Sequence, residues 1–405
     1  MNVLVLTYWS FTDALVQTYT LPYVRMIRKH VKPEDRVYLF TVERPGPTTP
    51  AAPPGPSGES LESIGIVHVW GAYSPFGLAA ALRWVFDLAR LWWLCMNGRV
   101  RVIHAFCTPA GVAGYVLSVL TGTPLIVDSY EPHAESMVEN GAWRAGSVRH
   151  RILSFFEARM SARAEVLIGT TAAMHQYARD RYGVTPRRFH AKPACVDLER
   201  FRADQPGTLE LRANLGLSGK LVCVYAGKIG GIYLERELFE FFREASEHWA
   251  DRFRVLMLTP ASRESVDRLA RSAGLDPSTI VSSFVPHAEI ARYLALGDFA
   301  VNPVKPVPSK RYCTSIKDGE YWATGLPVVI TPGISDDSEI IAREGIGAVL
   351  RDLSPEAYRE AVGEIDRLLT SEDREALAKR IREVARRLRS LDIAEAVYEG
   401  VYRSR

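Results

Sequence analysis

The chain has 405 residues, of which 47% are hydrophobic and 24% charged, ordinary values for a folded globular protein that exclude wholesale disorder. This length is too great for one hydrophobic core and predicts two domains. The formal net charge of +3 is too small to indicate nucleic-acid binding. The five cysteines are widely spaced and include no CxxC pair, so neither a zinc site nor a redox pair is supported.

The first residues and the longest apolar stretch bear on localisation. Asn2–Leu6 has the pattern of a strand and no basic segment before it, so we expect no secretory signal and a cytoplasmic protein. The apolar stretch 76–96 is interrupted by Arg83, Asp87 and Arg90, which makes it a poor membrane span.

In the first half of the chain, short apolar runs rich in β-branched residues alternate with segments of helical periodicity. The expected strands are residues 3–7, 37–42, 66–70, 102–105, 125–128 and 166–170, and the expected helices are 19–30, 78–96, 109–120 and 147–163. Continuous apolar strands that alternate with helices indicate a parallel sheet covered on both faces, a doubly wound α/β domain. The segment 45–58, PGPTTPAAPPGPSG, is expected to form a surface loop within this domain.

The same alternation begins again after residue 220. Strands are expected at 221–227, 254–259, 280–284, 299–303, 327–331 and 348–350, with helices at 234–249, 262–273, 287–296 and 316–324. We therefore predict a first domain over 1–198 and a second over 199–390, with the last helix, 391–405, packing back on the first. In open α/β sheets, ligands bind beyond the carboxyl ends of the strands, so two such edges that face each other would form a cleft.

The segment 314–331, TSIKDGEYWATGLPVVIT, is the most informative part of the chain. Ser315 and Asp318 have the spacing of a capping box, which would open a short helix and leave the backbone N–H groups of Ile316 and Lys317 free at its N-terminus. Such a terminus suits an anion, here a diphosphate. Glu320, one turn further, could accept hydrogen bonds from vicinal hydroxyls. The alternative is a capped surface helix with a solvated glutamate.

This segment, SxKxxEYxAxGxPVV, resembles the donor-site segment of the retaining glycosyltransferases of family four, the group 1 glycosyltransferases. Four further segments resemble that family in the right order: 102–128, 193–201 (PACVDLERF), 224–228 (VYAGK) and 284–298. The resemblance covers nearly the whole chain. It implies the α/β fold called GT-B, two Rossmann-like doubly wound domains facing a central cleft.

Carried over by position, the resemblance assigns Glu320 to the nucleotide ribose, and Gly227 and Lys228 to the donor diphosphate. The family's first motif glutamate, which the resemblance assigns to the donor sugar, would stand eight residues before Glu320, where this chain departs from the family and has Tyr312. A second family lysine about five residues after Lys228 is also absent. The chain has Tyr233 and Leu234 there, with Arg236 as a stand-in. Ser315, Ile316 and Lys317 complete the expected donor site.

The first domain supplies further candidates. The resemblance places a histidine against the donor sugar near His133, whose tautomer Glu131 or Glu135 could fix. The alternative is an ordinary surface histidine. Tyr8 and Trp9, followed by Asp13, occupy the loop expected to border the acceptor, with Glu131 also on that side. Two aromatics there suit a stacking platform for a sugar or a plug in the core. His104 has the surroundings of a buried structural histidine.

The segment 78–96 allows two interpretations. Arg83, Asp87 and Arg90 form one narrow polar stripe and the remaining positions are apolar, including three tryptophans. The favoured interpretation is a helix buried under another helix. The alternative is that it forms, with the basic run 143–163, a patch facing a membrane.

The sequence as a whole predicts an enzyme that transfers a hexosyl group, with retention, from a UDP- or GDP-sugar to a hydroxyl of a glycan, glycolipid or small molecule. Bacterial glycan or glycolipid synthesis, in the cytoplasm or at the cytoplasmic face of a membrane, is the expected setting. No metal, other cofactor or nucleic acid is expected. The alternatives are a nucleotide-sugar epimerase of the same shape, and a non-catalytic sugar-nucleotide-binding subunit that has lost the first motif glutamate.

Overall fold

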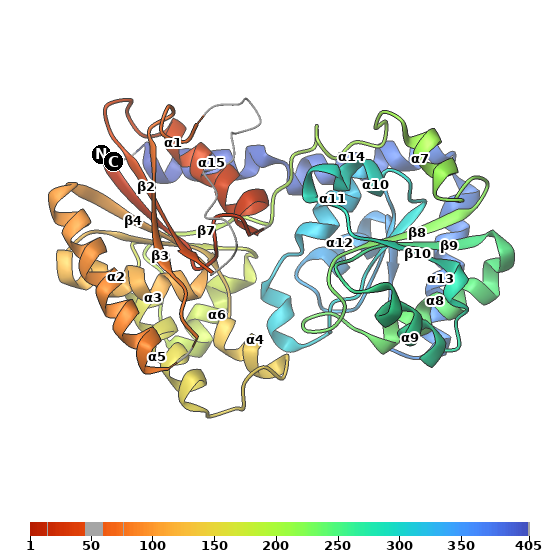
Figure 1. The fold of residues 1–405 in the computed structure, drawn as a ribbon, viewed down its shortest axis with the longest axis horizontal. Coiled ribbons are helices and arrows are strands. Elements are labelled where there is room, and N and C mark those ends of the chain that lie inside the picture. The colour runs from red at the N-terminus through yellow and green to blue at the C-terminus, as the bar shows by residue number, and fades with distance from the viewer. Residues whose placement is uncertain (14, 45–59, 76, 404–405) are drawn as a thin grey trace. The chain divides into compact units, whose positions relative to one another are not determined.

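The computed structural model of the chain describes residues 1–13, 15–44, 60–75 and 77–403, so the loop expected at 45–58 lies outside the described residues. The chain forms two compact units. Unit 1 comprises Met1–Pro193 together with Asp392–Arg405, and unit 2 comprises Ala194–Leu391 (Figure 1). Unit 2 is thus inserted between the main part of unit 1 and its last helix.

Unit 1 contains a seven-stranded parallel sheet in the order β3-β2-β1-β4-β5-β6-β7. Its strands are β1 (Asn2–Leu6), β2 (Val37–Glu43), β3 (Ile66–Ala72), β4 (Val100–Phe106), β5 (Leu125–Tyr130), β6 (Val166–Gly169) and β7 (Phe189–Ala191). Its helices are α1 (Leu21–Lys29), which follows a π-turn at Val16–Thr20, α2 (Leu78–Asn97), α3 (Cys107–Thr121), α4 (His133–Glu139), α5 (Val148–Arg163), α6 (Ala173–Tyr182) and α15 (Leu391–Tyr402). Figure 1 shows α1 and α15 on one side of the sheet and α2, α3, α5 and α6 on the other.

The helix α15 joins unit 1 through a buried polar network. The hydroxyl of Tyr398 donates to Asp128 Oδ2 at 2.6 Å, and the hydroxyl of Tyr402 lies 2.8 Å from Nδ1 of His104. The ammonium of Lys192, fully buried, is 3.2 Å from Asp128 Oδ1. Burial alone would raise the pKa of Asp128, but Lys192, His104 and Tyr398 together hold it below its ordinary value. His104 is a buried structural histidine, as the sequence indicated.

Unit 2 contains a six-stranded parallel sheet in the order β10-β9-β8-β11-β12-β13. Its strands are β8 (Leu221–Ala226), β9 (Phe253–Leu258), β10 (Ile280–Ser283), β11 (Phe299–Asn302), β12 (Val328–Ile330) and β13 (Gly347–Val349). Its α-helices are α7 (Thr208–Asn214), α8 (Arg236–Trp249), α9 (Arg263–Ser272), α10 (Ile290–Leu294), α11 (Ile316–Thr324), α12 (Asp337–Glu344), α13 (Pro355–Ser371) and α14 (Arg374–Arg389).

One apolar cluster lies on each face of this second sheet. Residues of α10, α11, α12 and α14 pack on one face, and residues of α8, α9 and α13 pack on the other. Both sheets are therefore doubly wound, as the alternation of strands and helices predicted. The two segments that link the units run side by side, since the N–H of Val196 donates to the carbonyl of Arg389 at 2.8 Å.

The favoured interpretation of α2 as a buried helix is wrong. Within this helix only Leu88, Leu91 and Cys95 are buried, because a single sheet face can cover only one stripe of a helix. The opposite stripe is apolar and exposed, with Phe86 and Trp93 each more than 60% exposed. Among the described residues, no helix is both long enough and apolar enough to cross a membrane.

Candidate functional site

The carboxyl edge of the second sheet brings several predicted residues together. The strand β8 ends at Ala226 and leads directly into Gly227 and Lys228, and α11 begins at the same edge. Gly227 has a φ of +152°, and a Cβ atom there would lie 2.6 Å from Cε and 3.0 Å from Nζ of Lys317. A side chain at this position would displace the end of Lys317 and would be strained at this φ, so glycine lets Lys317 lie where it does. Gly227 and Lys317 are thus neighbours in space, 90 residues apart in sequence.

Tyr233 holds the ammonium of Lys317 in place. Nζ of Lys317 donates to the Tyr233 hydroxyl at 2.5 Å and lies 3.8 Å from the centroid of its ring. Tyr233 stands where the resemblance places a second lysine, so a positive charge reaches this position from α11 instead. Lys228, next to Gly227, is exposed, and its backbone carbonyl accepts a hydrogen bond from the hydroxyl of Tyr225. The loop after β8 therefore supplies one lysine, Lys228, and α11 supplies a second, Lys317, beside it.

Arg236, the expected stand-in for that lysine, has a different environment. Its guanidinium pairs with Glu240 at 2.7 Å in the first turn of α8, with 75% of its side chain exposed. The structure shows this i,i+4 pair and places Lys317, rather than Arg236, beside Tyr233. The sequence does not show which cation lies beside Tyr233, because that depends on how α11 packs against the loop after β8.

The predicted capping box at the start of α11 does not form. Ser315 is the N-cap residue, but its side chain makes no capping hydrogen bond. Asp318 is fully buried and accepts a hydrogen bond from Asn302 Nδ2 at 2.7 Å, so its carboxyl points into the unit rather than back to Ser315. Burial raises the pKa of Asp318 to about 7, although the hydrogen bond from Asn302 opposes this.

Asp337 takes over part of the role expected of the capping box. Its Oδ2 accepts the N–H of Ser315 at 3.3 Å, and its Oδ1 pairs with the buried guanidinium of Arg389. The first turn of a helix leaves N–H groups without intrahelical acceptors, here those of Ile316 and Lys317. The positive end of α11 and the ammonium of Lys317 therefore lie at one place, a combination suited to a diphosphate.

Glu320 is not a solvated surface glutamate, so that alternative is wrong. Its side chain is 9% exposed, and its Oε1 lies 3.6 Å from Nε2 of His287. Arg200 donates to Nδ1 of His287 at 2.8 Å, which leaves the ring proton on Nε2, facing Glu320. His287 and Arg200 were missed from the sequence. Both lie in the segments that carried the resemblance, 193–201 and 284–298, which was the signal available.

In unit 1, His133 begins α4 just after the carboxyl edge of the first sheet. Its Nδ1 lies 3.7 Å from Oε1 of Glu131, whereas Glu135 is occupied by Arg181 at 2.7 Å and by the Tyr177 hydroxyl at 2.8 Å. Of the two acids considered from the sequence, Glu131 is therefore the neighbour of His133. Both side chains are partly exposed, at 24% and 31%.

Glu157, a residue of α5 that the sequence did not single out, binds the first turn of α4. Glu157 is buried and accepts hydrogen bonds from the N–H of Ala134 at 3.0 Å and from the Tyr182 hydroxyl at 2.6 Å. Burial raises its pKa to about 7, against the effect of these hydrogen bonds. It holds the residue that follows His133 and so fixes where α4 begins.

The aromatic side chains of the loop after β1 differ in exposure. Phe11 is the buried aromatic of this loop, while Tyr8 is 46% exposed and Trp9 partly buried. Asp13 accepts the N–H of Leu15 at 2.9 Å and so caps the turn that leads to α1. Tyr8 and Trp9 remain candidates for contact with an acceptor, whereas the Asp13 carboxylate has a local structural partner.

Neither unit contains an evident metal site in the part of the chain that the structure describes, since no three histidine, cysteine, aspartate or glutamate side chains cluster there. The acidic pair Asp336 and Asp337 follows the donor-side strand β12, but Asp337 is fully buried and bound to Arg389 and Ser315.

Two models of known protein families match the chain. The model described as "Glycosyl transferase 4-like domain" matches residues 18–195, nearly all of them in unit 1. The model described as "Glycosyl transferases group 1" matches residues 221–386, in unit 2. The first match covers unit 1 and extends two residues past Pro193 into unit 2, whereas the second lies within unit 2 and contains every candidate residue from Gly227 to Glu320.

Known proteins and solved structures agree with these matches. The chain is 27% identical over 280 residues to D-inositol 3-phosphate glycosyltransferase 1 of Catenulispora acidiphila, a match that covers 65% of this chain and 63% of that protein. The fold is similar to that of sucrose-phosphate synthase from Thermosynechococcus elongatus, with a TM-score of 0.74, 15% identity and coverage of 100% and 99%. It is also similar to Anabaena HepE in complex with UDP-glucose, with a TM-score of 0.72, 14% identity and full coverage of both chains.

Proposed function

Because the chain belongs to the group 1 glycosyltransferases and has the GT-B fold, we propose that it transfers a hexosyl group from a UDP- or GDP-sugar to a hydroxyl, with retention at the anomeric carbon. The solved structure of Anabaena HepE with UDP-glucose supports a donor of this class. Retention and membership of family four rest on the resemblance of the donor segment alone.

The observation that carries the proposal is the ammonium of Lys317 lying over Gly227 at the N-terminus of α11. When the glycosidic bond of a nucleotide-sugar breaks, negative charge builds on the β-phosphate of the leaving nucleoside diphosphate. Two fixed ammoniums, Lys317 and Lys228, with the N–H groups of Ile316 and Lys317, would stabilise that charge. A site of this kind needs no metal ion, so we propose metal-independent transfer.

Glu320 is assigned to the ribose of the donor. A carboxylate accepts two hydrogen bonds from vicinal hydroxyls, and burial at the side of His287 keeps its orientation fixed. Ribose hydroxyls do not change during the reaction, so this contact should contribute to donor binding more than to the rate of transfer.

His133 is assigned to the donor sugar, and Tyr8, Trp9 and Glu131 to the acceptor side. Glu131 beside Nδ1 of His133 favours the proton on that nitrogen, with Nε2 free to meet a sugar hydroxyl. Retention without a protein nucleophile is explained if the leaving phosphate itself takes the proton of the attacking hydroxyl on the same face of the sugar. This mechanism asks for charge stabilisation and positioning rather than for a general base.

The acceptor is proposed to be a glycan, a glycolipid or a small hydroxylated molecule, with the enzyme acting in the cytoplasm or at the cytoplasmic face of a membrane. No nucleic acid is proposed as a partner, since the net charge is only +3. The curated relative from Catenulispora is named for a phosphorylated inositol, a small hydroxylated acceptor.

The test is donor consumption measured with UDP- and GDP-hexoses, with and without a mixed acceptor extract. Transfer predicts consumption that depends on the extract, and nuclear magnetic resonance of the product should show the anomeric configuration of the donor. Conversion of the donor without acceptor would instead support a nucleotide-sugar epimerase. Thermal stabilisation by donor without any turnover would support a non-catalytic subunit.

A further inference from the structure

The helix α2 carries an exposed apolar stripe along its whole length. Leu82, Phe86, Trp93 and Met96 recur at intervals of four, seven and three residues, which places them on one side of the helix. Each of these side chains is more than half exposed. A stripe of this width exceeds the scattered apolar residues of an ordinary surface and marks an interaction site.

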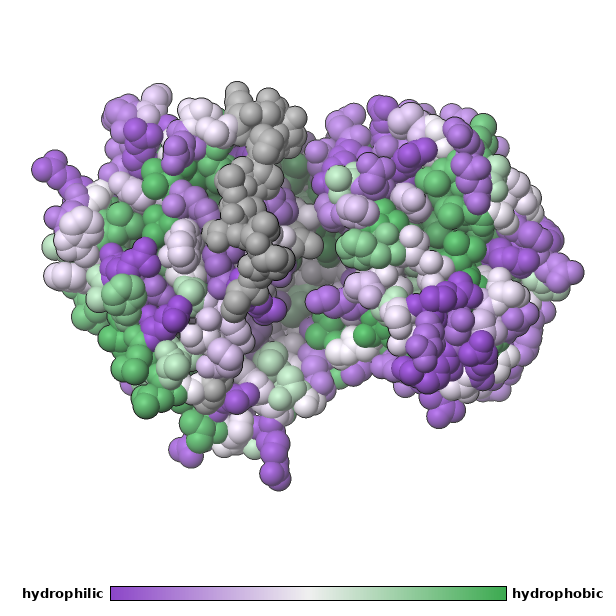
Figure 2. All heavy atoms as spheres, in the orientation of Figure 1, coloured by the Kyte–Doolittle hydropathy of each residue, from purple (hydrophilic) through white to green (hydrophobic). Residues whose placement is uncertain are grey.

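Two neighbouring helices extend the stripe. The helix α3 packs against both α2 and α5, so the three form one layer on the same side of the sheet. Val119 and Leu120 are exposed at the end of α3, and Val148, Ile152 and Phe155 form an exposed stripe on α5. Figure 2 shows hydrophobic side chains gathered over this part of unit 1, where Figure 1 places α2 and α5. We call this surface, formed by α2, α5 and the end of α3, the apolar face.

The charged groups on the apolar face are basic. The two helices contain two acids, and neither is well exposed: the side chain of Asp87 is 14% exposed, and Glu157 is buried. The exposed charges of the two helices are arginines: Arg83, Arg90, Arg149, Arg151 and Arg159. Arg159 lies over the ring of Phe155, 5.1 Å from its centroid, so apolar and cationic groups are interleaved.

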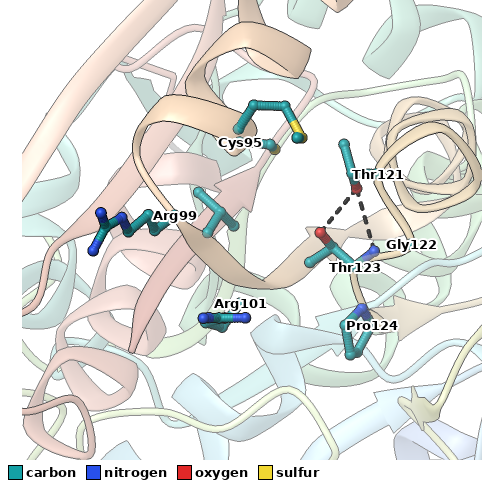
Figure 3. Close-up of a pocket in the computed structure, with 9 residues that line it drawn as sticks. Cys95, Arg99, Arg101, Thr121, Gly122, Thr123 and Pro124 are labelled. Carbon is teal, nitrogen blue, oxygen red and sulfur yellow. Dashed lines mark hydrogen bonds between the residues drawn. The ribbon is translucent and has the colours of Figure 1, made fainter.

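A pocket of about 420 Å³ opens beside the apolar face, at the amino edge of the first sheet. It is lined by the end of α2 (Cys95, Met96), the start of β4 (Arg99, Val100, Arg101) and the turn from α3 to β5 (Thr121, Gly122, Thr123, Pro124) (Figure 3). Within the described residues, neither arginine forms an ion pair or a hydrogen bond. Figure 3 shows Arg99 on the opposite side of the pocket from the Thr121–Thr123 turn, with its guanidinium directed away from that turn, and Arg101 lower in the view. Donor and acceptor candidates follow strands at the other, carboxyl edge, so this pocket is a separate feature.

We infer that the apolar face is a docking surface for a membrane rich in anionic phospholipid, and that the pocket with Arg99 and Arg101 receives a phosphate headgroup. The tryptophans and phenylalanines would enter the interface between headgroups and acyl chains, while the arginines meet the phosphates. The interleaved arginines favour lipid over a second copy of the chain, because two copies joined by this face would bring like charges together. The inference locates the membrane contact of the proposed function but does not depend on transferase activity.

The first experiment is sedimentation of the full chain with vesicles, without donor or acceptor present. Binding should be strong to phosphatidylcholine vesicles that contain phosphatidylglycerol, weak to phosphatidylcholine alone, and reduced by salt, because the arginines act partly through screened electrostatics. No binding to the anionic vesicles at low salt would overturn the inference.

Variants locate the surface. Phe86→Ser/Trp93→Ser should weaken vesicle binding by about tenfold or more, since each removes an aromatic group from the interface. Arg151→Glu/Arg159→Glu should weaken binding to anionic vesicles by about tenfold or more and leave binding to neutral vesicles nearly unchanged. The matched controls are Leu209→Ser, 85% exposed on α7, and Arg271→Glu on α9, which should bind as the parent does. All these side chains are exposed, so melting temperatures should remain near that of the parent.

The pocket has its own test. Arg101→Gln should lower the preference for anionic over neutral vesicles by about fivefold, the effect of one arginine at a lipid surface. If Arg101→Gln keeps the parent's preference for anionic over neutral vesicles, the pocket does not receive the headgroup. Concentration-dependent dimerisation, measured by sedimentation velocity and abolished by Phe86→Ser/Trp93→Ser, would show that a second copy covers the face and would overturn the lipid assignment.

Discussion

The ammonium of Lys317 donates a hydrogen bond to the hydroxyl of Tyr233 and lies 3.8 Å from the centroid of its ring. Tyr233 occupies the position where the family's second lysine is expected, so the tyrosine both replaces a cation and orients another one. A chain that lacks one lysine of the motif thus retains two positive charges at the edge of the second sheet.

The first prediction concerns this pair. Lys317→Ala should lower kcat by about tenfold to a hundredfold, because it removes a charged contact to a phosphate whose charge grows as the bond breaks. Tyr233→Phe, which keeps the ring but loses the hydroxyl, should have a smaller effect, of about threefold to tenfold. Steady-state kinetics with saturating acceptor measures both, and Lys32→Ala, on the surface of unit 1, is the control. Parent-like kcat in Lys317→Ala would contradict the assignment of this lysine to the diphosphate.

The second prediction separates the roles of Lys228 and Glu320. Lys228→Ala should chiefly lower kcat, whereas Glu320→Gln should chiefly raise the KM for the donor, since ribose contacts are equal in the ground and transition states. Each loss should be about tenfold to a hundredfold. Thermal melting must show both variants folded, which matters more for Glu320 because it is buried against His287. If either variant binds and turns over donor like the parent, the proposed site is misplaced.

The third prediction concerns metal ions. Both lysines and the N-terminus of α11 are part of the protein, so prolonged treatment with EDTA should leave donor binding and turnover unchanged. Calorimetric titration with the donor before and after chelation measures donor binding, and initial rates measure turnover. A loss of activity that Mn²⁺ or Mg²⁺ restores would show that the diphosphate needs a cation that these groups do not replace.

The fourth prediction concerns pH. Burial raises the pKa of Asp318 to about 7, above the value of about 3.9 expected for an unfolded aspartate. Between these two values the folded state binds more protons than the unfolded state, so this residue's contribution to stability is present at low pH and falls as pH rises towards 7. Asp318→Asn, which cannot ionise, should therefore gain stability relative to the parent as pH rises from about 4 to about 7.

Urea unfolding at several pH values measures that difference, and Asp204→Asn on the surface provides the control. A constant difference in free energy of unfolding between Asp318→Asn and the parent across this range would show that the pKa of Asp318 is not raised in the folded protein.

The alternation of strands and helices was enough to predict six strands of each sheet, because each buried parallel strand is a continuous apolar run and each covering helix has its own period. The edge strand β7 was not predicted, since its three residues form no buried apolar run. The environment of single residues was harder to predict. Ser315 and Asp318 have the spacing of a capping box, yet Asn302, distant in sequence, draws the Asp318 carboxyl into the core. Likewise, Arg236 was the expected replacement for the missing lysine, yet the packing of α11 brings Lys317 to Tyr233 instead.

The order in which the polypeptide emerges from the ribosome has a consequence for unit 1. All of unit 2, residues 194–391, is synthesised before α15, whose Tyr398 and Tyr402 complete the network around Asp128 and His104. Until then Asp128 lacks the hydrogen bond from Tyr398, and the side of the sheet that α15 covers stays open to solvent. The native state of the first half of the gene product is thus reached only after the second half has been translated.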